Sequence, residues 1–322
     1  MTAIILFFSM IIGLLWPVSV FSKTYDLSEP DELHAVPTVL KAVHGLSVLK
    51  NRLFFFGYGQ EDYVESTILP EGKTREGRFG RYGDNKRIAN PKTKYPGEWR
   101  GILKEDEKHR ILWDASMLQI VRISLKDNSV AEEATVPVDL LSPPEDRIGK
   151  ATQYETKIAR KKFKAAYKKL FGPRYTGLVP LPKKWERASE EDRYLIATKI
   201  ESFPLIVLAC DAKDPMNCMM ERFCSLDDHF SVDAPDVRGV AADPESKTLV
   251  VGDSKTNILH FFKWSSCMKI DYRYSLKLPK LVQTMTSVHI DESKRLWVTT
   301  GKWEYKYDSN VYYWEQQEWM KP

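Results

Sequence analysis

Short apolar strands separated by polar turns recur along the chain and predict β-hairpins. Residues 100–116 read RGILKEDEKHRILWDAS, residues 238–254 read RGVAADPESKTLVVGDS, and residues 286–302 read TSVHIDESKRLWVTTGK. A looser copy, HGLSVLKNRLFFFG, begins at His44. In each copy an apolar strand leads into a turn rich in Asp, Glu, Ser or Lys, and a second strand of aliphatic and aromatic residues follows, which is the pattern of a hairpin.

The spacing of these copies predicts a β-propeller. Gly45 and Gly101 are 56 positions apart, Gly239 and Ser287 are 48 apart, and the 138 positions from Gly101 to Gly239 equal three steps of 46. A period in the forties, with three or four strands in each unit, is typical of propeller blades. We therefore expect an all-β propeller with six blades. Five or seven blades are the alternatives, and an ordinary sandwich of repeated hairpins is the competing architecture.

Two further segments fit the repeat. Residues 194–210, YLIATKIESFPLIVLAC, predict another hairpin inside the long gap. An N-terminal strand near residues 36–43 is expected to complete the last blade, because closing the ring removes exposed strand edges.

Two insertions interrupt the repeat. Residues 72–100 are rich in Gly, Arg, Lys and Pro and predict a long exposed loop. Within a second insertion at about 141–190, residues 152–171 predict a helix, because apolar residues recur there every three or four positions. We therefore expect residues 23–322 to form a single propeller domain that carries both insertions.

The N-terminal residues predict export. An apolar run from Ala3 to Phe21 precedes Lys23, the first charged side chain, and Ser22 fits the small-residue preference of a signal-peptide cleavage site. We interpret residues 1–22 as a signal peptide and expect a secreted or periplasmic protein that is not integral to the membrane. Because the run is only just long enough to span a bilayer and no Lys or Arg precedes it, an uncleaved membrane anchor is the alternative.

The four cysteines predict disulfides. An even count in an oxidising compartment favours two bridges, for which three connectivities exist. We expect Cys210 to pair with Cys218 across the loop DAKDPMN, and Cys224 to pair with Cys267. The spacings of eight, six and 43 residues match no common zinc pattern, and four buried reduced thiols are the other alternative.

The copy RGVAADPESKTLVVGDSKTNILHFF resembles blades of the NHL and gluconolactonase-like (senescence-marker-type) six-bladed propellers. This resemblance implies a fold that hydrolases, scaffolds and receptors share. The lactonase branch implies a divalent cation held by Asn and Asp side chains just before the glycine of each first strand. The matching positions here are Arg238 and Thr286, with Arg100 in another blade, and such side chains are poor ligands for a hard cation.

No catalytic motif is recognisable in the sequence. It contains no GxSxG, no HExxH, no phosphate-binding glycine loop and no EF-hand loop. We therefore expect no cofactor and no metal, and we favour a protein without enzymatic activity over an enzyme. Arg100 and Arg238 either line the channel and favour an anionic ligand, or are solvated or salt-bridged residues of the rim.

Two further groups of side chains are interpreted as structural. Asp114 and Asp253 follow second strands and are expected to cap turns rather than to catalyse. Seven aromatic residues crowd the C-terminal segment; we expect them to close the last blade, with a binding face for sugars or peptides as the alternative. They are Trp303, Tyr305, Tyr307, Tyr312, Tyr313, Trp314 and Trp319.

Both insertions are basic although the net charge of the whole chain is only +4. Residues 150–174 contain nine basic side chains and one acidic side chain, and residues 72–100 contain nine basic and three acidic side chains. The predicted helix carries Arg160, Lys161, Lys164 and Lys168 on its polar face. These charges fit an acidic protein, a polysaccharide or an anionic lipid surface, and the export signal argues against nucleic acid.

These observations favour an exported, non-enzymatic binding or scaffold propeller of the cell envelope or extracellular space, which engages an acidic partner through its basic insertions. A metal-dependent hydrolase of the lactonase type is the alternative. The hydrolase requires stoichiometric metal, and the residues at the expected ligand positions disfavour it.

Overall fold

The computed structural model describes residues 24–30, 32–35, 43–50, 52–57, 63–67, 86–88, 99–115, 118–137, 175–185, 191–198, 205–224, 226, 236–267, 269–282, 284–301 and 309–320. The predicted signal segment 1–22 and the predicted helix 152–171 lie outside these residues. Of the predicted loop 72–100, only residues 86–88 and 99–100 are described, and both pieces are β-strand. No helix within the described ranges is long and apolar enough to cross a membrane.

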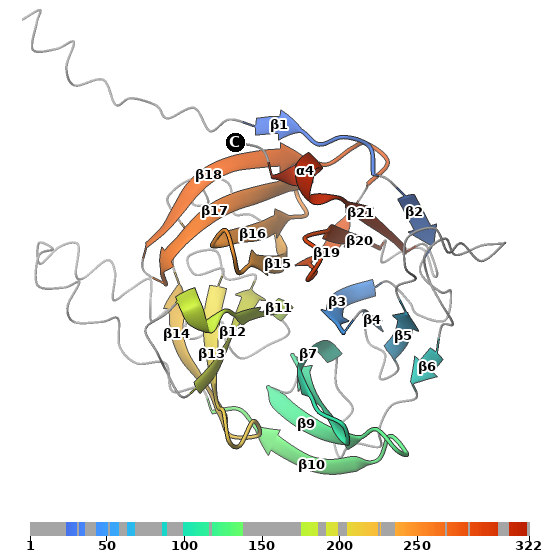
Figure 1. Ribbon diagram of the computed structural model, residues 1–322, viewed down its shortest axis with the longest axis vertical. Coiled ribbons are helices and arrows are strands. Elements are labelled where there is room, and N and C mark those ends of the chain that lie inside the picture. The colour runs from blue at the N-terminus through green and yellow to red at the C-terminus, as the bar shows by residue number, and fades with distance from the viewer. Residues whose placement is uncertain are drawn as a thin grey trace, which may run out of the picture.

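The described strands form five sheets arranged as blades around a central axis (Figure 1). Blade 1 consists of β3 (Val43–Leu49), β4 (Arg52–Gly57), β5 (Tyr63–Thr67) and β6 (Lys86–Ile88). Blade 2 consists of β7 (Trp99–Glu105), β8 (His109–Asp114), β9 (Gln119–Ser124) and β10 (Val130–Thr135). Blade 3 consists of β11 (Tyr175–Leu181), β12 (Glu191–Thr198), β13 (Leu205–Asp211) and β14 (Cys218–Cys224), with the 3-10 turn η1 (Lys183–Trp185) after β11.

The last two blades each add a strand from the N-terminal segment. Blade 4 consists of β15 (Val237–Asp243), β16 (Thr248–Asp253), β17 (Ile258–Ser266) and β18 (Lys269–Lys277), and β1 (Thr24–Asp26) pairs in parallel with β18. Blade 5 consists of β19 (Met285–Ile290), β20 (Leu296–Thr300) and β21 (Asn310–Trp314), and β2 (Glu32–Ala35) completes it. A short helix, α4 (Gln316–Trp319), follows β21.

The described chain forms five blades, the predicted alternative, and not the expected six. Between Gly101 and Gly239 the expected three repeat steps would require two blades, but the described strands there build only blade 3. The remaining length lies in the segment before β11, so dividing the gap by the repeat period overestimated the number of blades.

The ring is closed by the N-terminal segment, as expected, but by a different stretch of it. The strand that pairs with β21 is β2, which ends at Ala35, so the strand expected near residues 36–43 is misplaced by several residues. Val43 instead begins the inner strand of blade 1. Of the seven C-terminal aromatic residues expected to close the last blade, four are buried in or beside blade 5: Tyr312, Tyr313, Trp314 and Trp319. The other three, Trp303, Tyr305 and Tyr307, lie outside the described residues.

A separate hydrophobic cluster fills each boundary between neighbouring blades. The cluster between blades 1 and 2, for example, contains Phe54 and Tyr63 from blade 1 and Leu112 and Val121 from blade 2. The other four boundaries have clusters of the same kind. Burial of apolar surface between blades therefore holds the ring together, since each sheet is apolar on both faces.

Close contacts between inner strands set the spacing of the blades at the axis. A Cβ atom added to Gly239 would lie 2.6 Å from the backbone nitrogen of Val288 in blade 5. In the same way, a Cβ atom added to Gly45 would lie 2.9 Å from the carbonyl oxygen of Arg100 in blade 2. A side chain at either place would push neighbouring backbones apart, which explains why the repeat carries glycine there.

Both predicted disulfides are present. Cys210–Cys218 closes the β13–β14 hairpin, and Cys224–Cys267 links blade 3 to blade 4. All four cysteines are buried, and the described residues contain no free cysteine.

Replacement of Gly239 by Ala is expected to lower the free energy of unfolding by about 2–3 kcal/mol, because the added methyl group meets rigid backbone. Gly252→Ala is the matched control. Its Cβ would meet the Met285 side chain, whose flexible end can move aside, so the loss should be clearly smaller. Chemical denaturation of both variants tests this; equal losses would contradict the assigned role of Gly239.

Removal of Cys224–Cys267 is expected to destabilise the protein more than removal of Cys210–Cys218. The two bridges span 43 and eight residues, which in the chain-entropy description correspond to about 4 and about 2.5 kcal/mol. Paired Cys→Ser variants, unfolded by denaturant under non-reducing conditions, give the comparison. A larger loss for the short hairpin bridge would show that native-state packing outweighs the entropy of loop closure.

Candidate functional site

The two predicted arginines lie at equivalent positions of two blades. Arg100 in β7 and Arg238 in β15 each stand where the pairing with the second strand shifts register, one residue before the inner-strand glycine. A β-bulge of this kind lifts a residue out of the regular ladder. We call the five equivalent residues, one from each blade, the channel ring: His44, Arg100, Thr176, Arg238 and Thr286.

The inner strands of neighbouring blades contact one another around the central axis (Figure 1), and the channel-ring residues all stand near the starts of these strands. Arg100 and Arg238 are not adjacent, since the inner strand β11 lies between theirs. Arg100 is buried, whereas the Arg238 side chain is 24% exposed and its Nε donates a hydrogen bond of 2.8 Å to Asp236 Oδ2. Arg238 therefore pairs with an acidic side chain two positions before it in the chain, and a ligand-binding role for either arginine stays a prediction.

Two other polar groups at this end, Thr176 and Asp253, make structural contacts. Thr176 Oγ1 donates to the carbonyl oxygen of Val237 in the next blade at 2.9 Å. Asp253 accepts hydrogen bonds from the backbone of Lys255 and the hydroxyl of Thr256, which confirms that it caps a turn. No group of three His, Cys, Asp or Glu side chains that could hold a metal ion occurs among the described residues.

The lysine-rich surface predicted from the sequence cannot be placed. Arg160, Lys161, Lys164 and Lys168 lie outside the described residues, so the structure does not bring them together with the channel ring. It does show where the chain enters and leaves that insertion, because β10 and β11 are described on either side.

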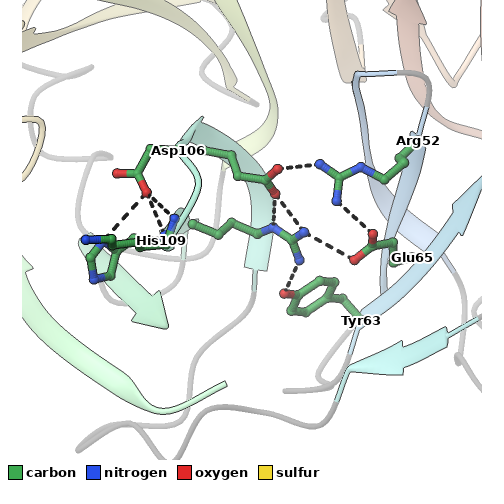
Figure 2. Close-up of polar contacts among 8 residues, drawn as sticks. Arg52, Tyr63, Glu65, Asp106 and His109 are labelled. Atoms are coloured by element: carbon green, nitrogen blue, oxygen red, sulfur yellow. Dashed lines mark hydrogen bonds and ion pairs between the residues drawn. The ribbon is translucent and has the colours of Figure 1, made fainter. Parts of the chain in front are cut away.

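A buried ionic cluster joins blades 1 and 2 at the opposite end of the blades (Figure 2). It consists of Arg52, Glu65, Glu105 and Arg110, together with the phenol of Tyr63. Glu105 binds both arginines: Arg110 Nη2 lies 2.7 Å from Glu105 Oε2, and Arg52 Nη2 contacts Glu105 Oε1. The side chains of Glu105 and Arg110 are each only 3% exposed. Two cations and two anions balance, which is what a buried ionic group requires.

Aromatic rings complete the surroundings of Arg110. Its guanidinium carbon lies 4.4 Å from the centre of the Phe54 ring, within cation–π range. Arg110 Nη1 also donates a hydrogen bond of 2.6 Å to the hydroxyl oxygen of Tyr63. Burial raises the pKa of Tyr63 above its ordinary value although Arg110 opposes the shift, so the phenol stays neutral and acts as an acceptor. Burial also opposes the charge of Arg110, but Tyr63 and Glu105 outweigh it and the pKa of Arg110 is raised.

The ionic cluster fixes one side of the β7–β8 turn, and the turn itself is held by Asp106. The Asp106 carboxylate accepts hydrogen bonds of 2.7 Å from the backbone N–H groups of Lys108 and His109, and these bonds lower the pKa of Asp106. His109 Nδ1 lies 3.6 Å from Asp106 Oδ1 (Figure 2). The turn therefore presents His109 and Asp106 in a defined arrangement.

A cavity of about 320 Å³ opens beside this turn, between blade 2 and the disulfide-closed hairpin of blade 3. Its volume falls at the lower end of the range for small-molecule sites, roughly 300–1,000 Å³. The lining is mostly polar, with cationic side chains from three segments. The lining residues are Lys104, Asp106, His109, Ile111, Arg122, Ala212, Lys213 and Pro215.

Sequence reasoning missed both the ionic cluster and this cavity. The stretch KEDEKHR, residues 104–110, predicts only the polar turn of a hairpin. A usable signal was the facing pair Glu105 and Arg110, which pairs opposite charges across the two strands. The cavity had no such signal, because Arg122 and Lys213 come from different blades and are 91 positions apart.

No known protein family matches the sequence. Among curated proteins there is likewise no match. Solved structures that resemble the chain include the β-propeller domain of Cps50 (Swd1) from Myceliophteria thermophila, with 10% sequence identity and a TM-score of 0.40. The similarity covers 83% of this chain and 66%, just under two thirds, of that chain.

Two further similar structures are named as enzymes or calcium-binding proteins. The glutaminyl cyclase of Myxococcus xanthus is 7% identical, over 88% of this chain and 94% of that one, with a TM-score of 0.44. The calcium-binding protein regucalcin from Agrobacterium tumefaciens is 9% identical, over 90% and 95% of the two chains, with a TM-score of 0.45. Similarities this distant identify no family and carry no functional argument. The described sheets themselves establish the β-propeller fold that the sequence resemblance implied.

Replacement of Glu105 by Gln is expected to lower the free energy of unfolding by about 3–5 kcal/mol, because it leaves the buried Arg110 and the partly buried Arg52 with one carboxylate between them. The control is Glu132→Gln. Glu132 is 46% exposed and pairs with Arg122, so its removal should cost less than about 1 kcal/mol. Denaturant titrations of the two variants decide the matter, and similar small losses would show that the cluster contributes little.

Proposed function

We propose that this protein is an exported, non-enzymatic binding propeller that engages an acidic partner through the basic insertion preceding β11. The observation that carries the proposal is where this insertion is attached. Thr135, at the end of β10, pairs with Gln119, and Gln119 pairs with Asp114, which faces Trp99 at the start of β7. Both β10 and β11 therefore meet the insertion at the channel-ring end of the blades.

The attachment point lies between the two predicted arginines. The insertion rejoins the propeller at Tyr175, and the next residue, Thr176, belongs to the channel ring. The strand β11 packs between β7, which carries Arg100, and β15, which carries Arg238. A segment with nine basic and one acidic side chain is thus tethered beside two further cations, and such a concentration of charge attracts anionic partners.

The first insertion contributes less to this surface than its charge suggests. Thr67 at the end of β5 pairs with Arg52, and Lys86 at the start of β6 pairs with Glu65, so residues 68–85 are attached at the opposite end. Only residues 89–98 lead back to the channel-ring end at Trp99. The proposed binding surface therefore rests on the second insertion.

The two disulfides support the exported location. Disulfides persist in oxidising compartments and are rare where thiols are kept reduced. Cys224–Cys267 also joins two blades, which suits a protein that must remain folded without cellular quality control. The lactonase-type hydrolase would require stoichiometric calcium or zinc in the purified protein, and a metal measurement distinguishes it from the binding propeller.

Changing Arg160, Lys161, Lys164 and Lys168 together to Glu is expected to weaken binding to heparin and to vesicles containing phosphatidylglycerol by at least tenfold. Exposed charges are screened within a Debye length of about 8 Å at physiological salt, so binding by the unmodified protein should also weaken as salt rises. Elution from a heparin column measures binding to a polysaccharide, and co-sedimentation with vesicles measures binding to an anionic lipid surface. Comparing the two shows which kind of partner the protein prefers.

The control changes Lys50, Lys108, Lys126 and Lys269 to Glu. These four lysines are exposed and lie at the opposite end of the blades. Each change to Glu alters the net charge by two, so the control and the test variant both alter it by eight. It should retain most of the binding. Equal losses in both variants would mean that only the net charge matters, and binding that ignores both salt and charge reversal would overturn the proposal.

A further inference from the structure

We infer that the cavity between blades 2 and 3 binds a small dianionic ligand, a phosphate monoester. This site is independent of the proposed function, because it lies at the opposite end of the blades from the channel ring and the second insertion. The argument rests on the donors that line the cavity, the balance of their charges and the volume they enclose.

Four nitrogen-bearing side chains converge on the cavity from three segments. Lys104 and His109 come from the β7–β8 hairpin, Arg122 from β9, and Lys213 from the loop closed by Cys210–Cys218. The β7–β8 turn is fixed by the ionic cluster and by Asp106, and the loop is fixed by its disulfide. The donors are therefore held on rigid supports before a ligand arrives, which reduces the cost of ordering them on binding.

These donors retain hydrogen-bonding capacity. Lys104 Nζ donates to Asp192 Oδ2 at 3.2 Å, which leaves two of its three N–H groups. Arg122 Nη1 lies 2.7 Å from Glu132 Oε2, while its Nη2 is 3.6 Å from Asp214 Oδ1, beyond direct hydrogen-bond distance. Lys213 has no side-chain hydrogen bond or ion pair with any described residue.

The charge of the lining matches a dianion. Lys104, Arg122 and Lys213 contribute three positive charges and Asp106 one negative charge, which leaves an excess of two among these four side chains. A phosphate monoester carries about −1.5 to −2 at neutral pH. The acids that pair with these cations, Asp192, Glu132 and Asp214, are not part of the lining. They orient the cations and, together with Asp106, offset the positive charge of Lys104, Arg122 and Lys213, so recognition depends on directed hydrogen bonds and not on bulk charge.

The size of the cavity also fits a small ester. About 320 Å³ suffices for a phosphate with a compact organic group and is too small to enclose a folded segment of a partner. Ile111 and Pro215 supply apolar surface beside the cations, which suits the organic part of an ester better than a free ion.

The test is isothermal titration calorimetry on the full chain with glucose 6-phosphate, inorganic phosphate and glucose. Saturable binding of the two phosphates and none of glucose is expected, and the ester should bind more tightly if the organic part enters the cavity. Binding of inorganic phosphate with equal affinity would assign the site to the free ion. No saturable binding of either phosphate would overturn the inference.

Two variants locate the binding. Lys213→Gln alters an exposed loop side chain without a partner among the described residues, so it should fold normally and weaken phosphate binding several-fold. Lys104→Gln combined with Lys213→Gln should weaken it at least tenfold. Lys126→Gln, an exposed lysine of the β9–β10 turn that does not line the cavity, is the matched control and should bind as the unmodified protein does.

The two proposals fail separately. Reversal of the four charges in the predicted helix should leave glucose 6-phosphate binding unchanged, and the Lys104 and Lys213 variants should leave heparin and vesicle binding largely intact. Unaltered phosphate affinity in the double variant would place any observed binding elsewhere on the protein and would refute the cavity as its site.

Discussion

The close approach of the inner strands around the axis is the constraint on which the rest of this structure depends. At Gly239 and Gly45 the neighbouring backbone lies where a side chain would begin, so the inner strands can pack only as closely as glycine allows. This packing brings the two faces of each sheet against its neighbours and buries a hydrophobic cluster at every boundary between blades. The positions of the outer strands, the turns and the two candidate surfaces follow from that spacing.

Directional contacts reinforce the apolar boundaries, and they differ from one boundary to the next. Blades 1 and 2 share the ionic cluster around Glu105, and blades 3 and 4 share Cys224–Cys267. Lys294 of blade 5 pairs with Asp243 of blade 4, and the Ser309 hydroxyl accepts a hydrogen bond from the backbone N–H of Val43 at 3.0 Å. Apolar burial supplies most of the stabilisation, while these contacts fix the register between particular blades.

The two ends of the blades are chemically different. One end carries the channel ring, with Arg238 at its rim and the second insertion attached beside it. The other end carries the ionic cluster and the cavity lined by Lys104 and Lys213. The proposed acidic partner and the proposed phosphate ester are therefore assigned to opposite ends of the blades.

The sequence by itself determined the local features of this protein. Alternation of apolar and polar residues located the hairpins, and the spacing of Cys210 and Cys218 across one of them indicated their pairing. Both depend on neighbours along the chain. The number of blades, the β2 strand that closes the ring and the cavity were decided only by tertiary structure. They depend on which distant segments pack together. Arg122 and Lys213, for example, line the same cavity from two different blades, and no period or motif along the chain indicates that these two segments lie side by side.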